Sequence, residues 1–200
     1  MRRTWILIAI SSLVSVSICA KPNDENVYTN NQYGFKLNYP ATVKPASHVR
    51  SFYHVTKGWS QLTLGKSQQG QHAVVSFPLE NRKGKQGFYF YAALRVGIST
   101  HPKDVSSCYR KPFYPIGPGT ICHCQSKLAF HALPLISMGM MQVMQGTSYR
   151  IRHKGKCYAV ELIATGLNGP QFNALYDEAK QTACRMIYSF AWINHTLPSH

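Results

Sequence analysis

Apolar residues recur at helical spacing near the C-terminal end of the chain. Between residues 172 and 190 they fall on one stripe with a period of about 3.6 residues, directly after Gly169-Pro170, a favourable helix start. The opposite side of this stretch is polar: Asp177, Glu178, Lys180, Gln181 and Arg185. The pattern predicts an amphipathic helix that buries one face.

Two alternating segments flank the pair Lys154-Gly155 and predict a β-hairpin. If this pair forms a two-residue turn, Ile151 lies opposite Tyr158 and Arg152 lies opposite Cys157. One face of the hairpin is then apolar and the other basic. We expect the C-terminal helix to cover the apolar face.

Alternation elsewhere predicts a strand-rich middle of the chain. The expected strands are residues 33–39, 61–64, 72–77 and 88–98, with turns at residues 65–70 and 78–87. Residues 109–120 contain three prolines and predict an irregular crossing segment. The apolar residues 128–144 fit either a helix or a strand. The predicted fold class is α+β: a central antiparallel sheet with a C-terminal amphipathic helix packed on one face.

The N-terminus has the pattern of a secretory signal peptide. A short positive start precedes an apolar stretch, and Ala20 offers a small residue for cleavage, so residues 1–20 are expected to be removed. An uncleaved anchor and a lipoprotein processed at Cys19 are the alternatives. Residues 21–30 are expected to form a polar lead-in, residues 31–195 a single α+β domain, and residues 196–200 a tail. No transmembrane segment is expected after the leader, which predicts an exported protein, periplasmic or secreted.

Composition adds a strongly basic character to this picture. The chain has 22 Lys and Arg against 7 Asp and Glu, and 44% of its residues are hydrophobic, which excludes a disordered, coiled-coil or collagen-like chain. The basic residues crowd two places, a turn with Arg82, Lys83 and Lys85 and the hairpin with Arg150, Arg152, Lys154 and Lys156. Such density predicts an anionic partner, either an envelope component or an acidic protein. Nucleic acid is not expected, because the chain is exported and carries no nucleic-acid-binding motif.

Five cysteines remain after removal of the leader, and an exported chain is expected to pair them as disulfides. Cys157 lies on the predicted basic face, away from the helix, so its favoured partner is Cys108 in the irregular crossing. Cys184, on the flank of the helix, is expected to pair with Cys122 or Cys124. One thiol is left over.

The catalytic motifs of known hydrolases and nucleotide-binding proteins are missing from the sequence, and acidic residues are few. We therefore expect a protein that is not an enzyme and holds no cofactor; a hydrolase with an unrecognised site is one alternative. The other alternative is a periplasmic copper-binding protein, because soft sulfur ligands favour monovalent copper. Its candidate ligands are Cys122, Cys124, Met138, Met140, Met141 and Met144. The competing interpretation is a disulfide beside methionines that fill the core.

Two segments resemble the PsbP/Mog1-like domains. The first strand of these domains resembles the run Tyr28-Thr-Asn-Asn-Gln-Tyr33-Gly-Phe-Lys-Leu-Asn-Tyr39-Pro40. Their C-terminal end resembles the predicted helix that ends in Ile187-Tyr-Ser189-Phe190. The resemblance implies a central antiparallel sheet flanked by helices and an accessory role without catalysis, and it brings no catalytic residues. The cysteines, the methionine run and the basicity depart from the family. The combined expectation is an exported, non-enzymatic binding or accessory protein whose basic surface engages an anionic envelope or extracellular partner.

Overall fold

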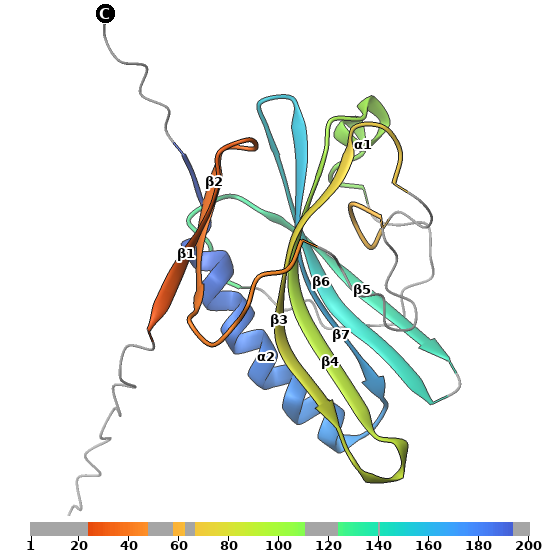
Figure 1. Ribbon diagram of the computed structural model, residues 1–200. Helices are drawn as coiled ribbons and strands as arrows, with labels where there is room; N and C mark the ends of the chain where they lie inside the picture. Colours follow the sequence, from red (N-terminus) through yellow and green to blue (C-terminus); the bar gives the residue numbers. More distant parts are fainter. Residues whose placement is uncertain (1–23, 48–57, 63–66, 111–123, 140, 194–200) are drawn as a thin grey trace, which may run out of the picture.

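The computed structural model describes residues 24–47, 58–62, 67–110, 124–139 and 141–193. These residues form two antiparallel sheets and two α-helices, which is an α+β architecture (Figure 1). The expectations for the signal peptide, for Cys122, for Met140 and for the tail at residues 196–200 lie outside the described residues.

The larger sheet has five strands in the order β3-β4-β7-β6-β5, and all neighbours are antiparallel. The strands are β3 (Gln71–Lys83), β4 (Tyr89–Ser99), β5 (His131–Gly139), β6 (Gln142–His153) and β7 (Lys156–Leu167). The expected hairpin is confirmed in β6 and β7, with Ile151 opposite Tyr158. Lys154 and Gly155 have φ angles of 45° and 71°. Two successive positive values are what a type I′ turn requires.

The smaller sheet has the order β1-β2-β8, with β1 (Glu25–Asn30), β2 (Phe35–Pro40) and β8 (Ala191–Trp192). Residues 25–30, which were expected in a polar lead-in before the domain, form strand β1. Tyr28 of β1 packs its ring edge-on against Phe77, with 5.6 Å between ring centroids, whereas Val27 is exposed. An edge strand with one solvent-exposed face has a largely polar sequence. The alternation of hydrophobic and polar residues that predicts a strand is therefore weak in β1.

Two further expectations about strands were wrong. Strand β3 continues through Pro78 to Lys83, where the sequence predicted a turn. It is an edge strand and its register shifts between Pro78 and Glu80, so the missing N–H of proline is tolerated. Residues 61–62, expected in a strand, form a turn within the short buried segment 58–62.

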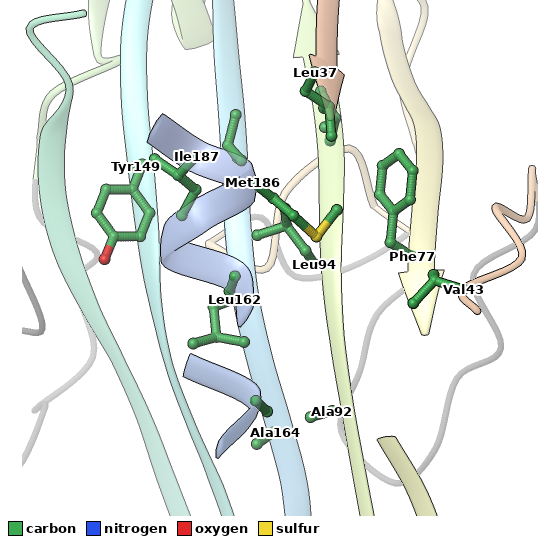
Figure 2. Packing of buried hydrophobic residues seen from close by; sticks show 14 of the residues in the cluster. Leu37, Val43, Phe77, Ala92, Leu94, Tyr149, Leu162, Ala164, Met186 and Ile187 are labelled. Atoms are coloured by element: carbon green, nitrogen blue, oxygen red, sulfur yellow. The ribbon is translucent and has the colours of Figure 1, made fainter. Parts of the chain in front are cut away.

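The long helix α2 (Pro170–Ser189) begins at the expected Gly169-Pro170 pair and contacts strands β2, β3, β4 and β7. Its buried side chains are those of the predicted stripe: Phe172, Leu175, Tyr176, Ala179, Ala183, Met186 and Ile187. Figure 2 shows Met186 and Ile187 beside Leu94 of β4 and Leu162 of β7. None of the helices in the described ranges is both long and apolar enough to cross a membrane.

The other face of the larger sheet is covered by segment 58–62 and by the short helix α1 (Pro102–Ser106) with the residues that follow it. Trp59 packs there with Cys108 and Cys157, which form a disulfide. A second disulfide joins Cys124 to Cys184 of α2. Both pairs are among those that the sequence favours.

Candidate functional site: a basic β-turn

Arg150, expected on an open basic face, is buried: only 3% of its surface is exposed. Strand alternation placed it correctly on the face opposite α2, but that face is covered by Trp59, whose ring lies 4.8 Å from the Arg150 guanidinium. The interpretation of Arg150 as a partner contact was wrong. Alternation assigns a side chain to a face of a sheet and does not say what lies on that face.

The buried arginine belongs to a charge cluster with Arg95 and Glu161. Each guanidinium forms an ion pair with the Glu161 carboxylate, with an N–O distance of 3.6 Å in both cases. The same carboxylate accepts hydrogen bonds from the hydroxyls of Ser60 and Ser148, at 2.8 and 2.9 Å. These contacts satisfy the charge of Glu161, as a buried carboxylate requires.

The charge cluster also fixes segment 58–62 to the sheet. The backbone N–H of Gln61 donates to Glu161 at 3.0 Å, Arg95 donates to the carbonyl of Gly58, and Arg150 donates to the hydroxyl of Ser60. Burial lowers the pKa of Arg150 to about 10, so the side chain remains charged at neutral pH, and Glu161 opposes this shift. We interpret this cluster as structural, because its groups bind one another.

Three cationic residues remain exposed or half-exposed where β6 turns into β7: Arg152, Lys154 and Lys156. We call these three residues the basic turn. None of them lies within ion-pair distance of a carboxylate in the part of the chain that the structure describes, unlike Arg82, which pairs with Glu80 at 3.2 Å. Their charges are therefore free to act on a partner.

Aromatic rings hold the basic turn from both sides. The His153 ring stacks on Trp192 of β8, with 3.9 Å between centroids and 9° between planes. On the other face the Arg152 guanidinium lies 5.0 Å from the Tyr109 ring, and the Arg152 backbone N–H donates to the Tyr109 hydroxyl at 3.0 Å. The turn thus keeps a defined geometry although it projects from the sheet.

The electrostatics of the turn are visible at His153. Partial burial lowers the pKa of its imidazole below the ordinary value of 6.5, and the positive charges of Lys154 and Lys156 lower it further. A second proton is disfavoured where two lysines already raise the local potential. The same positive potential attracts an approaching anion.

The other predicted basic residues form a separate cluster. This cluster consists of Arg82, Lys83 and Lys85, which are exposed where β3 turns into β4. It lies at the opposite end of the larger sheet from the basic turn (Figure 1). Ser99 of β4 pairs with Cys157 at one end, and Phe90 pairs with Gly166 at the other. Nine residues of strand, about 30 Å, separate these pairs. The two clusters do not form one surface.

Three of the described candidate copper ligands, Cys124, Met138 and Met144, do not come together either. Cys124 is bonded to Cys184. Met138 pairs with Val143, whereas Met144 pairs with Ser137 and packs against Leu135 and Ile163. Met138 and Met144 therefore project from opposite faces of the sheet, because successive positions in a strand alternate. In the described ranges, no group of three or more His, Cys, Asp or Glu side chains is arranged to hold a metal ion.

Tyr109 and Trp192 are parts of the site that sequence reasoning missed. Tyr109 lies 44 and Trp192 lies 39 positions from His153 in the sequence, and both reach the turn only through the fold, so no local pattern marks them. No protein-family model matches the chain, and no curated protein shows a significant sequence match to it. The fold and the site together define a disulfide-bonded α+β domain with a cationic turn that no described carboxylate neutralises.

Proposed function

We propose that the chain is an exported, non-enzymatic binding or accessory protein whose basic turn engages an anionic partner, either an envelope component or an acidic protein. One observation supports this proposal above the others. Arg152, Lys154 and Lys156 gather on a turn braced by aromatic rings, and no described carboxylate pairs with them. Cations held together and left unneutralised are a recognition surface for negative charge.

Export is part of the same proposal. It is supported by the leader-like residues 1–20 and by two disulfides, which persist in oxidising compartments. A PsbP/Mog1-like arrangement, with α2 packed on one face of the antiparallel sheet, is likewise proposed. The segments that resemble this family correspond to β1 with β2 and to the end of α2.

The two basic clusters provide a matched pair of variants for the test. The variant Arg152→Glu/Lys154→Glu/Lys156→Glu and the control Arg82→Glu/Lys83→Glu/Lys85→Glu change the net charge equally, at opposite ends of the sheet. The probe is fluorescently labelled inorganic polyphosphate, titrated at one ionic strength. We expect the basic-turn variant to bind at least about tenfold more weakly than the wild type, and the control to lose about threefold or less.

An equal loss in both variants would mean that only the overall charge attracts the probe, and would contradict the proposal. So would unchanged binding by the basic-turn variant. Circular dichroism and the unfolding midpoint of each variant confirm that the comparison is made between folded proteins.

A further inference from the structure

A surface hollow lies at the same end of the larger sheet as the basic turn. Residues that precede β3 and residues that follow β4 line it: Gln68, Gln69, Gly70, Thr100, His101 and Pro102. Its wall is partly polar and includes two side-chain amides, a hydroxyl and an imidazole. Groups of this kind both donate and accept hydrogen bonds.

The register of the strands places this hollow beside the basic turn. Thr100 lies one position beyond the last β4–β7 pair and Lys156 one position before it, so the two are neighbours across the strands. Lys156 pairs with His153 on its other side, and the Thr100 N–H donates to the Gly70 carbonyl at 2.8 Å. Gly70, Thr100, Lys156 and His153 therefore form one row across the sheet. The row leads from the polar hollow to a cation and then to an aromatic stack.

The exposed polar groups that line the hollow include the side-chain amides of Gln68 and Gln69. Nδ1 of His101 is shielded from solvent and has no hydrogen-bond partner among the described residues. The nearby carboxylate of Asp104 is already engaged, since it accepts hydrogen bonds from Ser99 and Gln71 at 2.6 Å each. A hydroxyl group bound in the hollow reaches the exposed side-chain amides of Gln68 and Gln69, whereas Nδ1 of His101 is closed to it.

We infer that the hollow and the basic turn together bind an acidic saccharide, a sugar chain that carries uronic acid carboxylates. Sugar hydroxyls pair with the amides of Gln68 and Gln69, while a carboxylate lies against Lys156. The apolar face of a neighbouring ring packs on the aromatic group of His153 and Trp192. A bare phosphate needs only cations and N–H donors, whereas this row offers hydroxyl-binding groups and ring surfaces as well. The inference rests on the proposed function, because it names the partner of the same turn.

Oligogalacturonate is the probe for this inference, and its fully methyl-esterified form, with the same rings and no charge, is the matched ligand control. The variant Gln68→Ala/Gln69→Ala/His101→Ala removes the polar wall without removing a lysine or arginine. The control variant Gln171→Ala/Asn173→Ala/Gln181→Ala removes similar groups from the exposed side of α2. By calorimetry we expect the wall variant to bind oligogalacturonate about tenfold more weakly, which corresponds to about 1.4 kcal/mol, and the α2 control to be unchanged.

Polyphosphate and vesicles that contain phosphatidylglycerol separate this inference from the proposed function. We expect the wall variant to bind both of them like the wild type, and the basic-turn variant to lose polyphosphate and oligogalacturonate together. Oligogalacturonate that binds no tighter than its methyl ester, or equally well to the wall variant, would overturn the saccharide inference and leave the polyphosphate result standing. A basic-turn variant that keeps its polyphosphate binding would overturn both.

Discussion

At the scale of single residues, Arg150 and Arg152 show how much two similar positions can differ. They are two positions apart on β6 and point to the same face, yet Arg150 is buried under Trp59 whereas Arg152 is exposed beyond it. The alternation of the sequence predicted the face of both side chains. It could not predict the burial of one of them, because Trp59 lies about 90 positions away in the chain.

The first prediction compares these two arginines. Arg150→Met removes one cation from the buried cluster and leaves Glu161 with Arg95 alone, so we expect the free energy of unfolding to fall by about 3–5 kcal/mol. Arg152→Met removes an exposed charge and a contact with Tyr109, and we expect a loss below about 1 kcal/mol. Urea unfolding of both variants with the disulfides intact measures the difference. Equal losses would contradict the assignment of Arg150 to a structural cluster.

At the scale of elements, sequence patterns predicted the strands and the helix that are stabilised by contacts between residues close together in the chain. The β6–β7 hairpin and the helix α2 carry their periods and their turn residues in one continuous stretch, and both were predicted with the correct partners or boundaries. Strand β1 and segment 58–62 are held by residues remote in the sequence, such as Phe77 and Glu161. Their own sequences carry no period that distinguishes them from loops.

Segment 58–62 gives a prediction about one glycine. A Cβ atom at Gly97 of β4 would collide with the backbone carbonyl of Trp59, so Gly97→Ala must displace the segment from the sheet. We expect a loss of at least about 2 kcal/mol in unfolding free energy and a red shift of Trp59 fluorescence, recorded in a Trp5→Phe/Trp192→Phe background. Gly139→Ala is the control, because a Cβ there meets no atom within 4 Å and should cost less than about 0.5 kcal/mol. Unaltered Trp59 emission in Gly97→Ala would show that the segment is not packed as described.

At the scale of the whole molecule, the fold places the excess positive charge of the chain in separate clusters. One basic cluster lies at each end of the larger sheet, and the end with the basic turn also holds the hollow, the His153–Trp192 stack and, nearby, the Cys108–Cys157 disulfide. The sequence predicted that these three cations lie together because all of them are within two residues of the Lys154-Gly155 turn; the register places Arg152 beside Cys157 and Lys156 beside His153. The sequence did not predict the hollow or the rings, which come together only through pairing of β4, β7 and β8 with distant strands.

The lowered pKa of His153 makes the folding stability of the protein depend on pH. The unfolded chain has the ordinary imidazole pKa of 6.5 and the folded chain a lower one. As the pH falls through the interval between the two values, the unfolded state binds the proton first, and folding stability decreases. A bound anion offsets the charges of Lys154 and Lys156 and therefore raises the folded-state pKa again.

The most direct test of the central claim is the pKa of His153, measured by NMR titration in the free protein and with saturating polyphosphate at matched ionic strength. If the basic turn is the binding site, the pKa lies below 6.5 in the free protein and rises when polyphosphate binds, because the anion lies beside the imidazole. Sodium chloride at the same ionic strength, which screens the lysines without a specific site, produces the smaller rise. Saturated binding that leaves the pKa of His153 where sodium chloride puts it would place the anion elsewhere and contradict the account.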